Sequence, residues 1–489
     1  MASSTNVSPP PCSEYDRVPA RRKFLFVSLA AAGLASLRPA ETVAATNLVV
    51  SNVTGLYSVT VAKIGAPTTA EDVSRLVKKW PAQIAVGGGR FSMGGQVAVK
   101  DGLHLDMRQM SRVIWIRPGE KVVRVQAGIR WRDLQDVLDP LGLAVKTMQS
   151  YASFTVGGSV SVNAHGRYVG HGAIGNTIRA LQLVLADGSV VECSPRTNRE
   201  LFRSAIGGYG AVGIITEVEL ELAENVVIAR AVEELSLSQY FHHFKSKVLN
   251  DETSILHNAD LMPPRFDQAV SVTWRRAGSE TGLTEKRRLV PRDQKYSLEQ
   301  NALWAMTELP GGSQIRRSLI HPLVGKKPAV AWLNHEASLD VAELEPRTRA
   351  LSTYVLQEYF IPPQHAESFA KALPQTLLAH RVEVLNISIR HSPGDQISAM
   401  PWAKQEVFCF VIYFKQRTWR SARDKVGVWT RELIDLALAH AGRYYLPYQI
   451  HATRSQFEAA YPEIEEIRRA KVRFDPFGKF SNELWRAYL

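Results

Sequence analysis

Cysteines, blocks of like charge and long apolar runs are scarce in this 489-residue sequence, and each scarcity excludes a class of protein. Three cysteines (Cys12, Cys193 and Cys409) are too few for a disulfide scaffold or a cysteine-ligated metal cluster. No set of His, Cys and carboxylate residues has metal-ligand spacing, so no metal site is predicted. The 59 Lys and Arg residues exceed the 47 Asp and Glu residues, but they are scattered. Scattered charge argues against a nucleic-acid partner and favours at most the steering of anions.

The remaining composition is that of an ordinary globular protein, with 45% hydrophobic residues and 22% charged residues. It excludes collagen-like, wholly disordered and coiled-coil proteins. At roughly 100–200 residues per domain, the length allows two to four domains.

Residues 1–45 have the features of an export signal. Arg21 and Arg22 precede an apolar run over 24–37, and small residues follow at 43–45. The run is too short to span a bilayer, which leaves an uncleaved membrane anchor as the alternative. The adjacent arginines resemble a twin-arginine signal. That resemblance predicts export to the periplasm by the twin-arginine machinery, with a cofactor already bound.

Residues 46–225 are predicted to form one α+β domain built from short strands. Thr68 and Glu71 have the spacing of a capping box at the start of a helix that ends at Pro81. A second helix is expected over 131–138. Strands are expected over 83–86, 103–107, 122–125, 181–185, 190–192 and 214–222.

Residues 226–440 have a different pattern and are predicted to form a second domain, and residues 441–489 are predicted to form a compact tail. Helices are expected over 237–249 and 363–379. Strands are expected over 269–274, 382–390 and 406–415, and 276–328 is expected to be a loop.

Three glycine-rich segments, at 85–96, 150–166 and 207–215, expose an unusual amount of bare backbone. Without side chains, backbone N–H groups can approach a phosphate closely. The first segment lacks the third glycine of the Gly-x-Gly-x-x-Gly dinucleotide motif, and it lacks the Gly-Lys-Ser/Thr ending of a nucleotide-triphosphate loop. The three segments together predict one large, polar, phosphate-bearing ligand.

The order of four sequences resembles the FAD-binding domain of the vanillyl-alcohol oxidase family. They are GGGRFSMGGQ, TVGGSVSVNAHG, LVLADGSVVE and LFRSAIGGYGAVGIITEVELEL, and the tail KVRFDPFGKFSN is similar to the closing motif of that family. The resemblance covers 50–225 and 441–489. It implies a two-part, PCMH-type FAD domain completed by the tail, with an inserted substrate domain of antiparallel sheet flanked by helices.

The resemblance also implies which residues bind FAD. The first two segments would hold the pyrophosphate and flank the isoalloxazine, the third would meet the adenine end, and Asn482 would lie near the flavin ring. The implied residues are Gly87, Gly88, Gly89, Arg90, Phe91, Ser92, Ser153, Gly157, Gly158, Ser161, Asn163, His165, Gly210, Gly213, Ile214 and Ile215.

FAD is expected to be held noncovalently. Many relatives carry a flavin-linked His in the first segment, where this chain has Arg90-Phe91-Ser92. The other common linkage uses a Cys near the second segment, and no cysteine lies between Cys12 and Cys193. His104, His165 and His451 remain alternative linkage sites.

The family suggests oxidation of a CH–OH group in a sugar, polyol or lactone, with electrons passing to oxygen or another acceptor. Two departures are notable. Tyr448 stands roughly where sugar-alcohol, aldonolactone and decaprenylphosphoryl-ribose oxidases carry a lysine. Ser388-Ile389-Arg390 keeps the arginine of a Glu-x-Arg pattern without its carboxylate.

Four catalytic candidates follow. Tyr448 or His451 would accept a proton, Arg390 would bind an anionic or developing oxyanion group, and His165 would lie against the flavin. The structural alternatives are aromatic packing for Tyr448, an ion pair for Arg390 and a simple hydrogen bond for His165. Two other functions remain open. One is a flavoenzyme acting on an amine, a phenol or a carbon–carbon bond, or as a reductase. The other is a flavin-fold binding protein without turnover.

Overall fold

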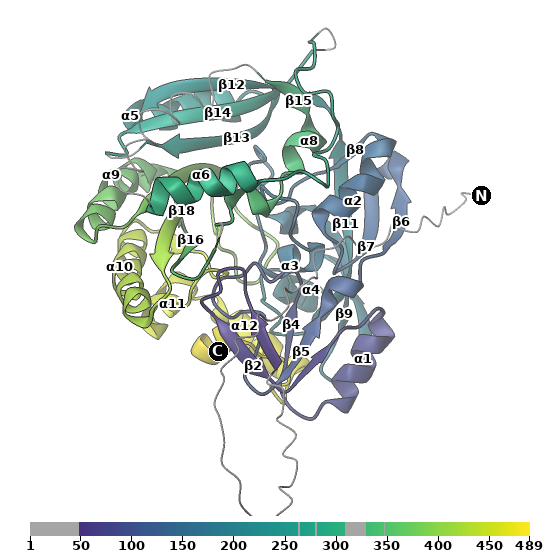
Figure 1. Ribbon diagram of the computed structural model, residues 1–489. Coiled ribbons are helices and arrows are strands. Elements are labelled where there is room, and N and C mark those ends of the chain that lie inside the picture. Colours follow the sequence, from purple (N-terminus) through teal and green to yellow (C-terminus); the bar gives the residue numbers. More distant parts are fainter. Residues whose placement is uncertain (1–47, 263–264, 279–280, 309–328, 347) are drawn as a thin grey trace, which may run out of the picture.

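The strands before residue 225 form three sheets in the described part of the chain (Figure 1). The computed structural model describes residues 48–262, 265–278, 281–308, 329–346 and 348–489, so the predicted export signal lies outside the described residues. The largest of these sheets is antiparallel, with strand order β10-β9-β11-β7-β6 and β8 paired to β11. Its strands are β6 (Val113–Arg117), β7 (Val122–Gln126), β8 (Leu143–Val145), β9 (Ile178–Val184), β10 (Val190–Cys193) and β11 (Ile214–Glu224).

Strand β11 shows why this part of the chain forms a sheet. Val218, Leu220 and Leu222 are buried, whereas Glu219 and Glu221 between them are partly exposed. Alternation with a period of two places the apolar residues on one face of the sheet. The strand predicted over 214–222 is therefore confirmed.

The other two sheets are small. A pair of antiparallel strands is formed by β1 (Leu48–Ser51) and β2 (Ser58–Val61), and three parallel strands are β3 (Lys63–Gly65), β4 (Ile84–Gly87) and β5 (Leu103–Asp106). Helix α1 (Ala70–Lys79) precedes β4 and is capped by Thr69, whose side chain accepts a hydrogen bond from the Asp72 amide. The predicted capping box at Thr68 and Glu71 is wrong by one residue.

The strands after residue 226 form one antiparallel sheet of eight strands, with order β15-β12-β14-β13-β17-β18-β16-β19. The helix and strand segments predicted in this region are confirmed. The strands are β12 (Val227–Ser236), β13 (Ser254–Leu261), β14 (Gln268–Arg276), β15 (Val330–Trp332), β16 (Ser352–Ile361), β17 (Val384–Ser392), β18 (Val407–Arg417) and β19 (Arg443–Tyr444).

Two long helices cover one face of this sheet, and the opposite face borders a cavity. Phe410 and Phe414 of β18 pack against Phe369 of α9 (Pro363–Ala379) and Trp429 of α10 (Arg420–Ala439), with ring centroids 5.0 and 4.9 Å apart. The alternate residues of β18 face the opposite way. Both faces of β18 are therefore buried, which explains its nearly continuous apolar sequence.

Helix α6 (Ser297–Glu308) lies in the segment 276–328, which was predicted to be a loop. The Glu308 carboxylate at its end forms ion pairs with Lys415 and Arg417 of β18. These ion pairs stabilise a helix whose sequence has no strong helical pattern. The prediction of a loop is therefore wrong for residues 297–308. Residues 309–328 lie outside the described residues.

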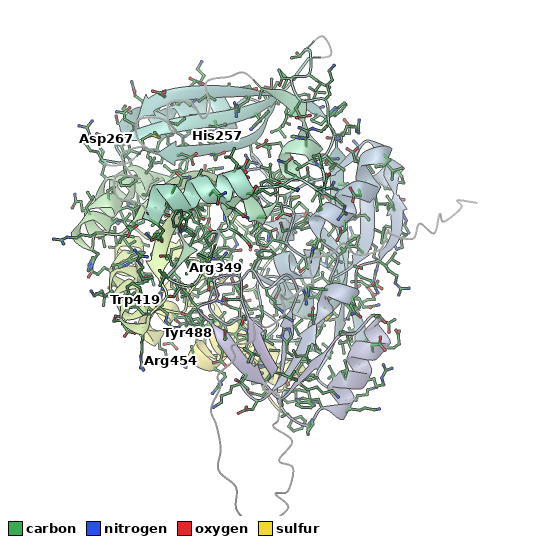
Figure 2. The ribbon with its side chains drawn as sticks, in the orientation of Figure 1. His257, Asp267, Arg349, Trp419, Arg454 and Tyr488 are labelled. Carbon is green, nitrogen blue, oxygen red and sulfur yellow. The ribbon has the colours of Figure 1, made fainter. Side chains whose placement is uncertain are left out.

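The remaining α-helices complete the described part of the fold. They are α2 (Trp131–Leu138), α3 (Val156–Ser161), α4 (Arg199–Ala205), α5 (Leu237–His243), α8 (Leu333–Ala337), α11 (Arg454–Ala460), α12 (Ile464–Phe474) and α13 (Glu483–Tyr488). In Figure 2, Arg454 and Tyr488 lie together near the C-terminus, where the Arg454 guanidinium donates to the Tyr488 carbonyl at 3.0 Å. Among the described helices, none combines the length and the apolar character that crossing a bilayer requires.

The C-terminal segment packs beside the first strands of the chain, as the yellow and purple ribbons of Figure 1 show. The Ile84 amide donates to the Lys479 carbonyl at 2.7 Å, and the Ser481 amide donates to the Ile84 carbonyl at 3.0 Å. Asp475 stabilises the turn that precedes the residues paired with Ile84. Its carboxylate, which is fully buried, accepts hydrogen bonds from the Lys479 and Phe480 amides and from Lys471.

We predict that Asp475→Ala lowers the free energy of unfolding by about 3–5 kcal/mol, because it removes the only carboxylate that pairs with the Lys471 ammonium among the described residues and leaves two amides without their acceptor. Urea unfolding followed by fluorescence measures the change. The matched control is Glu465→Ala, which removes an exposed ion pair with Arg468 of the same helix and should cost at most about 1 kcal/mol. Equal effects of the two substitutions would contradict the assigned role of Asp475.

Candidate active site

A cavity of about 510 Å³ lies between the three glycine-rich segments and the face of the eight-stranded sheet opposite α9 and α10. Its walls come from the first segment (Gly88–Met93), the second segment (Gln149–His165), the third segment (Tyr209–Ile215), strands β13, β16, β17 and β18, and the tail residues Tyr445, Pro447 and Tyr448. Segments more than 300 residues apart in the chain therefore meet around one space.

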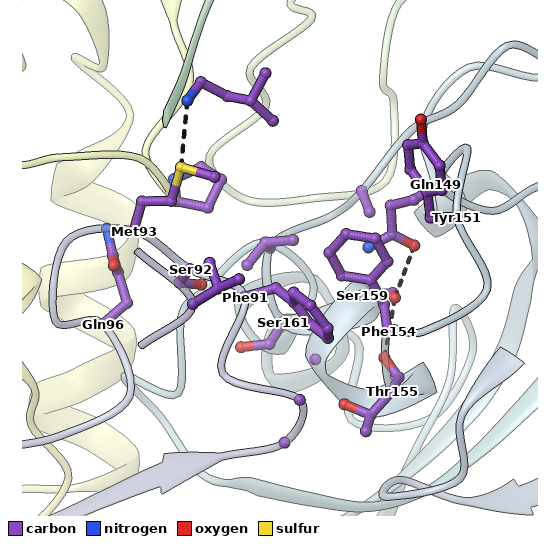
Figure 3. A pocket seen from close by; sticks show the side chains of 18 of the residues that line it. Phe91, Ser92, Met93, Gln96, Gln149, Tyr151, Phe154, Thr155, Ser159 and Ser161 are labelled. Atoms are coloured by element: carbon purple, nitrogen blue, oxygen red, sulfur yellow. Dashed lines mark hydrogen bonds between the residues drawn. The ribbon is translucent and has the colours of Figure 1, made fainter. Parts of the chain in front are cut away.

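The first segment needs its glycines because neighbouring side chains already fill the space behind it. A Cβ atom on Gly88 would collide with the Thr155 hydroxyl, and one on Gly89 would lie 2.7 Å from the Phe91 ring. Phe91 packs against Phe154 of the second segment with ring centroids 4.6 Å apart (Figure 3). The segment thus turns bare backbone toward the cavity and packs an aromatic side chain against its neighbour.

The second segment contains a short helix, α3, which the sequence did not predict. A Cβ atom on Gly157 would lie 2.6 Å from the Cβ atom of Ala127, so the helix packs closely on the sheet. The Ser159 hydroxyl lies 2.8 Å from the Gln149 side-chain oxygen and 2.9 Å from the Thr155 carbonyl, either of which can accept its hydrogen, and Figure 3 shows both contacts at the cavity wall. These bonds hold the start of the helix in place.

The third segment opens into β11. Gly210 has φ +74°, and nothing lies within 4 Å of the position that its Cβ atom would take. A left-handed backbone with open space beside it favours glycine and leaves the peptide groups accessible to a ligand. Gly213, Ile214 and Ile215 continue the same wall.

These observations fit a large polar ligand such as FAD. Glycine backbone from three segments lines one side of the cavity, and the Arg90 Nε, Ser150 Oγ and His165 Nδ1 atoms are buried there without a hydrogen-bond partner among the described residues. Buried polar atoms normally have partners, so their presence here favours a bound group that supplies them.

Five of the residues expected in the site do not line the cavity. They are Gly87, Ser153, Asn163, Asn482 and His451. Gly87 ends β4 beside the buried ring of His104. The Ser153 hydroxyl donates to Asp340 at 3.0 Å.

The two expected asparagines have structural partners. The Asn163 side chain donates to Asp395 at 2.7 Å and accepts from the Gly175 amide at 3.0 Å. Asn482 caps α13 and donates to the Tyr209 carbonyl at 2.9 Å. Asn482 therefore supports the third glycine segment from behind instead of facing the cavity.

Glu358 is a functional candidate that sequence reasoning missed. It lies on β16, lines the cavity and is only 3% exposed. One carboxylate oxygen lies 2.6 Å from His165 Nε2, and the other accepts a hydrogen bond from the Tyr448 hydroxyl at 3.2 Å. A glutamate inside the apolar strand 352–361 is the signal that could have identified it, because glutamate is rarely buried without partners.

The register of the sheet places Glu358 in relation to the Ser388–Arg390 motif. Glu358 pairs with Val411, which in turn pairs with Ser388, so the three residues form one row facing the cavity. The carboxylate that the motif lacks at Ser388 is thus present two strands away in the same row. Arg390 lies one row further along, and no ion pair to it is found among the described residues.

Polar side chains of β13 and β17 also gather in the cavity wall. Asn386 donates to Asp260 at 3.0 Å, and Asn258 lies 3.5 Å from the same oxygen. All three line the cavity, together with Ser388. Amide, carboxylate and hydroxyl groups of this kind can bind the hydroxyl groups of a substrate.

One group of possible metal ligands occurs in the described part of the chain, although no metal site was predicted. The ligand atoms of His165, Glu358 and Cys409 lie within 4.8 Å of one another. The hydrogen bond between His165 and Glu358 already engages two of them. Burial raises the pKa of the Cys409 thiol well above its usual value, so the thiol stays protonated. The chemistry of this set favours a hydrogen-bonded network over a metal centre.

Comparison with known proteins agrees with this site. Residues 61–194 match the family model described as an FAD binding domain. The chain is 25% identical to L-gulonolactone oxidase of Mus musculus over 84% of this chain and 90% of that protein. It is 24% identical to decaprenylphosphoryl-beta-D-ribose oxidase of Mycolicibacterium smegmatis, over 88% and 95% of the two chains. It is also 24% identical to alditol oxidase of a Streptomyces species, over 90% and 99%.

The chain is therefore an FAD-dependent oxidoreductase, as a cavity walled by glycine-rich backbone and acid–base side chains indicates. The matched domain and the similarity to the three oxidases just named support a PCMH-type FAD-binding oxidoreductase near those families. The resemblance that the sequence motifs suggested is confirmed.

His451 is partly buried and lies outside the cavity lining. Burial, and the positive charge of Arg431, lower the pKa of His451 to about 4. In the unfolded chain a histidine has a pKa of about 6.5, so protonation favours unfolding as the pH falls from 6.5 toward 4. We expect His451→Gln to reduce the loss of stability over that range, measured by urea unfolding at several pH values. The rate of flavin reduction by substrate should change by less than about twofold. A large loss of that rate with FAD still bound would return His451 to the catalytic candidates.

Proposed function

We propose that this protein is an exported enzyme that oxidises a CH–OH group of a small polyol, sugar or lactone. Electrons would pass to oxygen, which the oxidase names of its relatives support. The export proposal rests on the Arg21-Arg22 pair and the apolar run after it. Export through the twin-arginine system would suit a protein that folds around FAD before it leaves the cytoplasm.

The observation that carries the proposal is the composition of the cavity's two walls. Glycine-rich backbone forms one wall, and the opposite wall presents Glu358, Arg390 and Tyr448. FAD, when bound, supplies the acceptor for the hydride that leaves the substrate carbon. The side chains on the opposite wall can then bind the substrate oxygen and take its proton.

The residues that would hold FAD are those of the expected set that line the cavity. They are Gly88, Gly89, Arg90, Phe91, Ser92, Gly157, Gly158, Ser161, His165, Gly210, Gly213, Ile214 and Ile215. We propose noncovalent binding, because Phe91 offers no nucleophile and none of the described residues that line the cavity is a cysteine.

The sheets suggest which part of the chain binds FAD and which part binds the substrate. We propose that 46–225 and 441–489 form the FAD domain, since the tail packs along β4 next to the first glycine segment. Residues 226–440 would form the inserted substrate domain, whose antiparallel sheet supplies the polar groups opposite the glycines. Asn258, Asp260 and Asn386 suit a hydroxyl-rich substrate.

We expect the purified protein to be yellow and to lose its visible absorption when an oxidisable polyol, sugar or lactone is added without oxygen. Admitting oxygen should restore the colour. Acid precipitation should release the yellow colour to the supernatant, because FAD is held noncovalently. A flavin that no CH–OH donor reduces would contradict the proposed function, and colour kept in the pellet would contradict noncovalent binding.

We predict that Arg390→Met slows anaerobic flavin reduction by about 100-fold without loss of FAD, because the guanidinium stabilises charge that develops on the substrate oxygen. Stopped-flow absorbance measures the rate. The matched control is Arg276→Met, which changes an exposed arginine at the end of β14 and should leave the rate unchanged. If Arg390→Met reduces only FAD content, Arg390 has a structural role.

A further inference from the structure

Glu358 combines deep burial with access to the cavity. Its carboxylate bridges His165 from the second glycine segment and Tyr448 from the tail. Burying a carboxylate is costly unless it is hydrogen-bonded, and both of its oxygens are engaged here. Both partners line the cavity, but His165 belongs to the glycine segment proposed to hold FAD, so the Tyr448 hydroxyl is the one placed to meet a substrate.

We propose that Glu358 is the final acceptor of the substrate's hydroxyl proton and that the proton reaches it through the Tyr448 hydroxyl. His165 acts as a positioning residue that fixes the carboxylate. The proposal rests on the proposed oxidation of a CH–OH group and names the residues that handle its proton.

Tyr448 cannot serve as the base by itself. Burial, together with the negative charge of Glu358, raises the pKa of Tyr448 well above its usual value. The phenol is therefore protonated at neutral pH. It can accept a proton from the substrate only as it gives its own proton away, and the Glu358 oxygen 3.2 Å from its hydroxyl is placed to receive it.

The step balances in atoms and electrons. The substrate's C–H bond breaks and its electron pair leaves with the hydrogen to FAD, the oxidant named in the proposed function. The substrate's O–H proton bonds to Tyr448 Oη, and the proton of Tyr448 moves to Glu358 Oε2. The products are a carbonyl compound, reduced flavin and a protonated Glu358.

His165 is held in one orientation by aromatic neighbours. Its ring lies 4.7 Å from Trp402, 5.8 Å from Phe360 and 6.0 Å from Tyr445 between centroids. The Trp402 indole in turn donates to the Asn163 carbonyl at 2.8 Å. This packing fixes His165 Nε2 against one oxygen of Glu358 and leaves the other oxygen for Tyr448.

The test compares Glu358→Gln, Tyr448→Phe and the double variant by anaerobic stopped-flow reduction with the best donor found for the wild type. Each single variant should reduce its flavin about 100-fold more slowly, with the substrate dissociation constant changed by less than about tenfold. Because both residues belong to one relay, the double variant should be no slower than the slower single variant. Additive losses, or a wild-type rate in Glu358→Gln, would overturn the proposal.

A second His–Glu pair provides the matched control. Glu406 lies 2.8 Å from His391 Nε2, and neither residue lines the cavity. Glu406→Gln should leave the rate of reduction unchanged. If the wild type is reduced by no donor, the proposed function fails; if the wild type is reduced and Glu358→Gln equals it, only the relay fails.

A readout without turnover covers the case in which a variant binds FAD poorly. Fluorotyrosine labelling and ¹⁹F NMR can follow the ionisation of Tyr448, whose signal is assigned by its absence in Tyr448→Phe. Removing the carboxylate charge in Glu358→Gln should shift that ionisation to lower pH. His165→Asn should move the signal and slow reduction more than it weakens substrate binding. If Tyr448 ionises at the same pH in Glu358→Gln as in the wild type, the proposal is overturned. It is also overturned if each wild-type chain binds one metal ion tightly and Glu358→Gln loses that ion.

Discussion

The buried carboxylate of Glu358 is the contact on which the arrangement of the site depends. Through its two oxygens it joins a glycine segment that holds His165, a strand of the large sheet and the tail that holds Tyr448. A carboxylate taken out of water requires both contacts, since losing either partner leaves an oxygen unpaired at low dielectric. The three parts of the chain are thus held in a single relative position around the cavity.

The two sides of the cavity present different chemical groups to a ligand. The glycine segments present backbone, because side chains at Gly88, Gly89 or Gly157 would meet neighbouring atoms. The sheet presents side chains in rows, because register places Glu358, Val411 and Ser388 on one face across three strands. Backbone suits a phosphate-rich group that is common to many enzymes, whereas rows of side chains can differ between relatives without a change of fold.

Particular elements and residues show which features the sequence predicts and which depend on tertiary contacts. The strands over 214–222 and 406–415 and the helix over 363–379 were predicted because local periodicity and apolar runs define them. Helix α6 was missed because ion pairs from Glu308 to β18 stabilise it, and these are not visible in a local pattern. Asn163 and Asn482 were placed in the site by motif, but their side chains bond to Asp395 and to the Tyr209 backbone.

The sequence by itself determined the class of the protein, since the glycine segments and their order are local features that carry the FAD-binding motif. It also determined those strands and helices in which the spacing of apolar residues is regular, such as the strand over 214–222 and the helix over 363–379. Only the tertiary structure decided which acid–base groups meet. Tyr448, Glu358 and His165 are separated by 90 or more residues in the chain, and strand register and the docking of the tail bring them within hydrogen-bonding distance. Local sequence patterns contain no information on such distant pairings, because sheet register and tail docking are set by the packing of the whole chain.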